Sequence, residues 1–93
     1  MARGPDLEPD VAETAPSGDT LTKYDRKHFV TYLRLLDAHA ENAPWEDVAR
    51  IVLRLDPTAS PDAARRAYQT HLERAQWMTR SGYRELLLQS RPN

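Results

Sequence analysis

The sequence predicts an all-α fold, a small bundle of about four helices that contains a variant helix-turn-helix. Three observations support this prediction. Apolar residues recur at helical spacing through most of the chain, proline and glycine separate these periodic stretches, and no useful length alternates with the period of two that a half-buried strand requires. The chain has 93 residues, which suffices for one small domain.

The first predicted helix begins at Asp25, whose side chain can act as an N-cap, and ends before Pro44. Its predicted core-facing stripe follows the spacing i, i+3, i+4, i+7 and i+11 and consists of Phe29, Tyr32, Leu33, Leu36 and Ala40. Thr31 is predicted to face away from this stripe. Val30 and Leu35 lie beside it, so they belong either to the margin of the core or to an interface.

Pro44 suits the first turn of a second helix. Its predicted buried face consists of Trp45, Val48, Ala49, Val52 and Leu55. After a turn over residues 56–61, Ser60 followed by Pro61 predicts the start of a third helix, because a serine hydroxyl can cap a helix and proline lacks an N–H that the first turn does not need. The third helix is expected over residues 61–79. Its predicted buried face consists of Ala64, Ala67, Tyr68, His71, Leu72, Ala75 and Met78.

Gly82 is predicted to end the third helix, and a short fourth helix over residues 83–89 adds Tyr83, Leu86 and Leu87 to the core. The ends of the chain differ from this body. Residues 1–22 contain five acidic residues, one basic residue and no aromatic residue, so we expect a disordered acidic N-terminal arm. Residues 23–90 form the expected helix-turn-helix-like domain, and residues 91–93 a C-terminal tail.

The composition excludes several function classes. There is no cysteine, and therefore no disulfide scaffold, thiol nucleophile or cysteine-ligated zinc. No phosphate-binding loop or paired carboxylates are recognisable, so we expect neither an enzyme nor a cofactor or metal site. No apolar run is long enough to span a membrane and no secretory signal is evident, which favours a cytoplasmic protein. The net charge of −1 excludes a uniformly basic protein that coats nucleic acid.

The outward face of the third helix is the candidate functional surface. Its residues are Arg65, Arg66, Gln69, Glu73 and Trp77. Arginine and glutamine are residue types that contact phosphates and base edges, which favours a DNA-recognition helix. The acidic residues Asp62 and Glu73 on the same face argue against tight phosphate contact, because a negative charge at a helix start repels phosphate. Trp77 is either covered by the fourth helix or serves as an aromatic anchor for another protein.

Several segments carry a resemblance to a known family. They are Tyr24-Asp25-Arg26-Lys27-His28, Trp45-Glu46-Asp47-Val48-Ala49, and His71-Leu72-Glu73-Arg74-Ala75-Gln76-Trp77-Met78-Thr79 with Gly82-Tyr83-Arg84. Over about residues 22–89 the chain resembles a proteobacterial variant helix-turn-helix family found on integrative and conjugative elements. In that family the domain occurs fused in transcriptional activators such as FseA, and alone in small antiactivators of the QseM type. The single-domain layout of this chain is similar to the second kind.

The resemblance implies an antiactivator that binds an FseA-like activator, and also a LuxR-type quorum-sensing regulator, and so represses excision and conjugative transfer of the element. In that hypothesis Arg65, Arg66, Gln69, Glu73 and Trp77 contact the protein partner. The chain is then a monomer when free and does not bind DNA directly. The alternative is a DNA-binding transcriptional regulator that reads the major groove with Arg65, Arg66 and Gln69 of the third helix.

Overall fold

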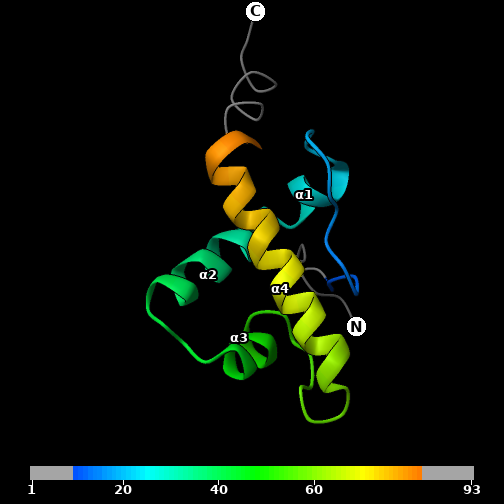
Figure 1. The fold of residues 1–93 in the computed structure, drawn as a ribbon, viewed down its shortest axis with the longest axis vertical. Helices are drawn as coiled ribbons and strands as arrows, with labels where there is room; N and C mark the ends of the chain where they lie inside the picture. Colours follow the sequence, from blue (N-terminus) through cyan, green and yellow to red (C-terminus); the bar gives the residue numbers. More distant parts are fainter. Residues whose placement is uncertain (1–9, 83–93) are drawn as a thin grey trace, which may run out of the picture.

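The computed structural model describes residues 10–82, which form four α-helices and one π-helical turn without any strand (Figure 1). The predicted all-α class is confirmed for this part of the chain. The predicted fourth helix, over residues 83–89, lies outside the described residues. Among residues 10–82, no helix combines the length and the apolar character needed to cross a membrane.

The first predicted helix is two helices in the structure, α1 (Lys23–Lys27) and α2 (Phe29–Ala40), separated at His28. The N-cap of α1 is Thr22, so the prediction that Asp25 caps the helix is wrong. Thr22 and Asp25 instead form a capping box, in which the backbone N–H of each donates to the side chain of the other, over 3.2 Å to the Thr22 hydroxyl and 2.8 Å to the Asp25 carboxylate.

The core-facing side of α2 is rotated from the predicted stripe. Tyr32 and Leu35 are buried together with Thr31, whereas Leu33 and Ala40 are exposed. The prediction is confirmed for Tyr32 but wrong for Thr31, Leu33 and Ala40. The reason is that α2 packs on α4 through Tyr32 and Leu35, and this contact determines which side of α2 is buried. Phe29 and Leu36 are half-buried at the margin.

A Schellman motif ends α2. The N–H of Ala43 donates to the carbonyl of Ala38 and the N–H of Asn42 to that of His39, each over 3.0 Å. Asn42 takes the required left-handed conformation, with φ 60°. The chain then reverses into α3 (Trp45–Ile51), for which Pro44 is the N-cap. Val48 and Ala49 are buried as predicted.

The long helix α4 (Pro61–Trp77) is the centre of the domain. Ser60 is its N-cap and Pro61 its first residue, as predicted, but the Ser60 side chain makes no capping hydrogen bond, contrary to expectation. The predicted buried face is confirmed except at Tyr68, which is half-buried. After Trp77 the helix widens into the π-helical turn η1 (Met78–Gly82).

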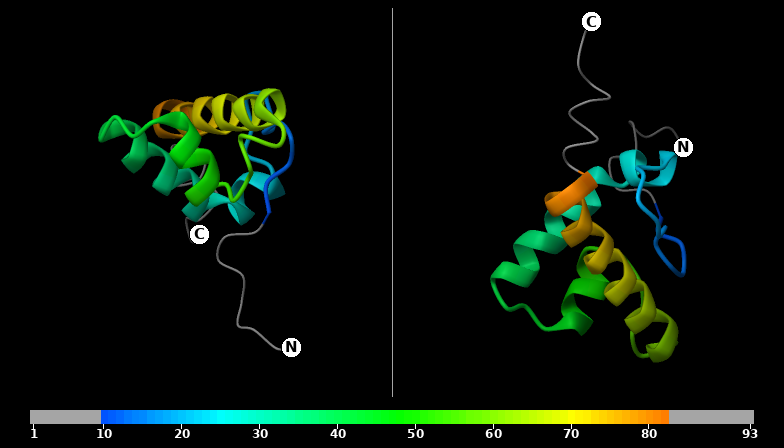
Figure 2. Two further views of the ribbon diagram at one scale, coloured as in Figure 1. Left: turned by 90° about the horizontal axis from the view of Figure 1, so that it is seen from below. Right: turned by 45° about the horizontal axis from the view of Figure 1, so that its top comes forward.

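Residues 10–22, here called the N-terminal segment, lie on the opposite side of α4 from α2 (Figures 1 and 2). The Ala15 N–H donates to the Thr70 hydroxyl over 3.1 Å, and the Arg74 guanidinium donates to the carbonyls of Gly18 and Thr20, each over 2.8 Å. Leu21 is part of the hydrophobic core. The sequence predicted a disordered arm over residues 1–22, and these contacts join residues 10–22 of that stretch to the domain.

Candidate nucleic-acid interface

Two helices and their connection form the candidate site: α3, residues 52–60, and α4. Val52 and Leu53 are buried, so the first part of the connection is held in the core. The Leu55 N–H then donates to the Ala49 carbonyl over 2.9 Å, which fixes the exit of the chain from α3. Arg54 between them has φ 59°, a conformation that non-glycine residues rarely adopt.

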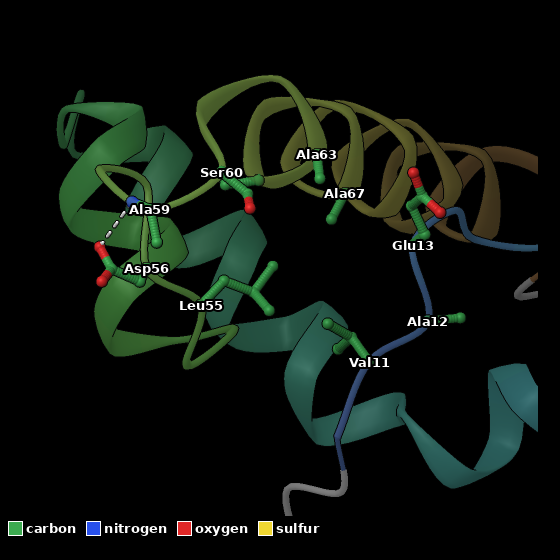
Figure 3. Close-up of a pocket in the computed structure, with 10 residues that line it drawn as sticks. Val11, Ala12, Glu13, Leu55, Asp56, Ala59, Ser60, Ala63 and Ala67 are labelled. Carbon is green, nitrogen blue, oxygen red and sulfur yellow. Dashed lines mark hydrogen bonds between the residues drawn. The ribbon is translucent and has the colours of Figure 1, made fainter.

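The Asp56 carboxylate closes the turn before α4. It accepts hydrogen bonds from the Thr58 hydroxyl over 2.6 Å and from the Thr58 N–H over 2.9 Å. It also accepts one from the Ala59 N–H over 3.3 Å (Figure 3). These hydrogen bonds, led by that of the Thr58 hydroxyl, lower the pKa of Asp56. The turn is therefore fixed by local side-chain bonds in the way that Asp typically fixes a loop, and it sets the direction in which α4 begins.

Arg65 and Gln69 form one exposed ridge of α4, here called the outer ridge. Both are exposed and lie four residues apart, so their side chains project from the same face of the helix. The Arg65 guanidinium carbon lies 5.6 Å from the centre of the Trp45 ring, at the junction with α3. Trp45 also contacts Tyr68, with ring centres 6.2 Å apart. The half-buried Trp45 therefore positions the base of this ridge.

Arg66 lies toward the N-terminal segment and is already paired. Its guanidinium donates to the Glu13 carboxylate over 2.8 Å. A second exposed pair joins the N-terminal segment to the connection, because Arg54 Nη2 lies 3.5 Å from Asp10 Oδ1. Two acidic residues of the N-terminal segment thus pair with two arginines of the candidate site, one in the connection and one in α4.

Glu73 and Trp77 continue the edge that Arg66 begins. Together with residues 15–18 they line a shallow hollow of about 250 Å³. The Arg74 guanidinium carbon lies 3.9 Å from the centre of the half-buried Trp77 ring. Ordinary packing by the N-terminal segment and Arg74 therefore covers part of Trp77. The five predicted site residues divide into an outer ridge, Arg65 and Gln69, and an edge beside the N-terminal segment, Arg66, Glu73 and Trp77.

A larger hollow, of about 460 Å³, lies between the N-terminal segment, the connection and the first half of α4 (Figure 3). Its walls are mostly apolar, with Val11, Leu55 and Ala67 among the lining residues. Its two carboxylates, Glu13 and Asp56, are already hydrogen-bonded to Arg66 and to the turn. The hollow therefore offers apolar surface rather than a charged binding site.

The sequence analysis missed a buried ion pair that supports this arrangement. The Arg74 guanidinium donates to both oxygens of the Asp25 carboxylate, from Nη2 over 2.7 Å and from Nε over 3.0 Å, and both side chains are almost completely buried. The Tyr32 hydroxyl donates to the same carboxylate over 2.7 Å. The helical spacing could have identified Arg74 as a buried residue. It lies three residues after His71 and seven after Ala67, on the predicted core face.

This network shifts the pKa of its members in physically consistent directions. Burial alone would raise the pKa of Asp25, but the hydrogen bonds from Arg74, Thr22 and Tyr32 outweigh it and hold the pKa at about 2. Burial and the neighbouring carboxylate raise the pKa of Tyr32, and the carboxylate also raises that of Arg74. The pair is therefore ionised at neutral pH and joins α1, α4 and the N-terminal segment.

His71 is a hydrogen-bonded core residue, as the sequence analysis expected. Its Nδ1 donates to the Ala67 carbonyl over 2.7 Å, and its Nε2 lies next to the Tyr24 hydroxyl. Burial lowers the pKa of His71, so the neutral ring is favoured. Nε2 of the neutral ring accepts a hydrogen bond from the Tyr24 hydroxyl, and this bond links α1 to the middle of α4.

One comparison with known proteins gives a match. A family model described as "T6SS, Transcription factor, DNA binding domain", the RovC DNA-binding domain family, matches residues 6–88. No curated protein matches the chain. The matched family is a DNA-binding domain of a transcription factor and not a class of enzyme.

This match corrects one prediction. The expectation that the chain does not bind DNA directly is wrong for a member of this family, because DNA binding is what the family description states. Asp62 and Glu73 do not exclude DNA binding, because DNA-recognition helices also carry carboxylates, which can accept a hydrogen bond from cytosine. The description does not mention antiactivation, quorum sensing or conjugative elements, so those remain predictions from the resemblance alone.

Proposed function

The chain belongs to the family of T6SS transcription-factor DNA-binding domains, and from this premise we propose that it binds double-stranded DNA with α4 in the major groove. The observation that carries the proposal is the family match over residues 6–88, together with an exposed outer ridge on the helix that follows the α3 connection. In helix-turn-helix proteins the N-terminal part of the second helix contacts the base edges. Arg65 and Gln69 occupy that part of α4.

In this proposal Arg65 and Gln69 read bases. Arginine pairs with guanine through two parallel hydrogen bonds, and glutamine pairs similarly with adenine. Arg65 rests on Trp45 at one side, which limits the number of positions its guanidinium can take and lowers the entropy lost on binding. Gln69, one turn further, reaches an adjacent base pair.

Arg66 contacts a phosphate instead. Arg66 lies on the edge of α4 rather than on the outer ridge. The sugar-phosphate backbone that walls the groove runs along the edges of a recognition helix. To bind a phosphate, Arg66 must exchange the Glu13 carboxylate for a phosphate oxygen. Asp62, exposed in the first turn, faces the same groove and weakens contact with any phosphate near the start of the helix.

Selection of duplexes from a randomised pool by the full-length chain tests the proposal, followed by fluorescence anisotropy titrations of the enriched duplex. We expect an enriched sequence, and binding that weakens steeply with salt because the bound arginines release counterions from the DNA. Arg65→Ala and Gln69→Ala should each weaken binding of the enriched duplex by about tenfold or more and relax the preference at one base pair.

Lys27→Ala is the matched control. Lys27 is exposed on α1, near the other end of α4, and its removal changes the net charge as Arg65→Ala does. It should alter the affinity by less than about twofold at physiological salt, because exposed charges beyond a Debye length of about 8 Å are screened. Equal losses in both variants, or a pool without enrichment, would contradict the proposal.

A further inference from the structure

Arg54 adopts a backbone conformation that favours glycine. Its φ is 59°, in the left-handed region where the Cβ atom of an L-residue crowds the following carbonyl oxygen. The residue lies in the connection, between the buried Leu53 and the half-buried Leu55. Glycine would take this conformation without strain, and the turn between two such helices often contains glycine. An arginine at such a position points to a role of its side chain.

The ion pair of Arg54 with Asp10 does not offset the cost of this conformation. Arg54 Nη2 lies 3.5 Å from Asp10 Oδ1, the Arg54 side chain is 43% exposed, and the Asp10 side chain is fully exposed. An exposed pair of this kind contributes less to stability than a left-handed non-glycine residue typically costs. The Arg54 guanidinium is therefore not explained by this pair, and it is accessible from the solvent.

A second arginine of the candidate site is paired in the same way. Arg66 on the edge of α4 donates to Glu13, which lies three residues after Asp10. Three residues span at most about 11 Å, so the two guanidinium groups face one short stretch of the N-terminal segment. This stretch lines the same hollow as residues 55–60 and the first half of α4 (Figure 3). Arg54 therefore continues, toward the connection, the edge on which Arg66 lies.

Two guanidinium groups along one edge suit the phosphates of a DNA strand, because phosphate oxygens accept from a guanidinium as carboxylate oxygens do. We propose that Arg54 is a second phosphate contact of the DNA interface, which acts beside Arg66 on the same strand and exchanges Asp10 for a phosphate oxygen. The inference rests on the proposed insertion of α4 in the major groove and extends the contact to the connection.

The salt dependence of DNA binding tests this contact in the full-length chain, by anisotropy titrations of the enriched duplex at several salt concentrations. We expect Arg54→Gln to weaken binding by about five- to tenfold at about 0.1 M salt. The slope of log K against log salt should become shallower by about 0.9, the value for one lost phosphate contact. Arg54→Lys keeps the charge and should retain most of the slope. Neither variant should change the preferred sequence, because phosphates carry no sequence information.

Arg34→Gln is the matched control. Arg34 is exposed on α2, which lies on the opposite side of α4 from the N-terminal segment, and the substitution removes the same charge. It should leave the slope unchanged. Equal slopes in the unmodified chain and in Arg54→Gln, or equal reductions in Arg54→Gln and Arg34→Gln, would overturn the Arg54 contact while the DNA-binding proposal stands. An unmodified chain that binds no duplex would overturn both.

Arg54→Gly separates a role in DNA binding from a role in folding. Glycine relieves the left-handed backbone, so the melting temperature of this variant should rise, or fall by less than about 4 °C. Its DNA binding should weaken as in Arg54→Gln. A larger fall of the melting temperature would show that the Arg54 side chain serves the fold, and DNA binding equal to that of the unmodified chain would show that it contacts no phosphate. Either result would overturn the proposal.

Discussion

At the scale of single residues, the pairing of Glu13 with Arg66 connects the N-terminal segment to the proposed DNA contact. The pair is exposed, and exposed ion pairs typically contribute only about 0.2–1 kcal/mol. This free energy is small for folding stability but matters for DNA binding. The N–H groups of Arg66 that donate to Glu13 cannot donate to a phosphate at the same time. In the proposed complex, Glu13 therefore competes with DNA for Arg66.

Replacing Glu13 should strengthen DNA binding. We expect Glu13→Gln to raise the affinity for the enriched duplex by about two- to fivefold, which corresponds to the free energy of an exposed pair. Anisotropy titration measures the change. Glu41→Gln, at an exposed residue after α2, removes the same charge elsewhere and should have a smaller effect. An equal gain in both variants would mean that only net charge matters.

The buried pair of Asp25 and Arg74 acts on stability instead. Arg74→Met keeps the bulk of the side chain but leaves the Asp25 carboxylate buried without its cation. We expect the free energy of unfolding to fall by about 3–5 kcal/mol, as when one partner of a buried pair is removed. Urea unfolding followed by circular dichroism measures the loss.

The double variant Asp25→Asn/Arg74→Met should recover part of that loss, because no uncompensated charge is then buried. Recovery should be incomplete, since Arg74 also holds the carbonyls of Gly18 and Thr20. A double variant less stable than Arg74→Met would contradict this account of the pair.

The same pair predicts how stability depends on pH. The pKa of Asp25 falls from an ordinary 3.8 to about 2 in the folded chain. The folded value is the lower one, so the unfolded chain binds a proton first as the pH falls. The resulting stabilisation, about 2 kcal/mol, is complete above about pH 4 and is lost as the pH falls toward 2. Unfolding free energies measured between pH 5 and 2 should show this loss, and Asp25→Asn should show a flatter dependence.

At the scale of elements, helix content and connections were largely predictable, whereas the orientation of α2 was not. Two prolines mark helix starts: Pro44 is the N-cap of α3 and Pro61 is the first residue of α4. Proline suits the start of a helix because its fixed φ is helical and the N–H that it lacks is not needed there. The spacing in α2 predicted a buried stripe that included Leu33, whereas the contact with α4 buries the side that carries Thr31 and Leu35. The π-helical turn η1 likewise has no sequence signal of its own.

The end of α2 gives a direct test of local backbone chemistry. Asn42 has φ 60°, which a β-branched residue tolerates poorly. Asn42→Val should lower the free energy of unfolding by about 1–2 kcal/mol, whereas Asn42→Gly should change it by less than about 0.5 kcal/mol, because glycine takes this conformation without strain. Thermal and urea unfolding measure both changes. Equal losses of unfolding free energy in the two variants would mean that the left-handed conformation of Asn42 in the Schellman motif does not determine its effect on stability.

At the scale of the whole molecule, amino-acid composition did not predict how the N-terminal segment packs on the domain. Residues 1–22 are acidic and lack aromatic residues, which is typical of disorder. Residues 10–22 nevertheless contact the rest of the domain through backbone groups, through the buried Leu21 and through two ion pairs, one to Arg66 of α4 and one to Arg54 of the connection. Hydrophobicity averages do not detect such contacts, because a buried Arg74 that binds carbonyl oxygens can hold a polar segment. The candidate residues of α4 were found by helical spacing, but Glu13 and Arg54, far apart in sequence, were not.

We propose that the first half of α4 contacts DNA, and the backbone amide chemical shifts of the chain, followed as the enriched duplex is added, test this directly. The largest changes are expected on residues 61–70, with a further change at Glu13 as Arg66 leaves it. Changes that cluster on α2, or an unchanged spectrum in the presence of a saturating duplex, would contradict it.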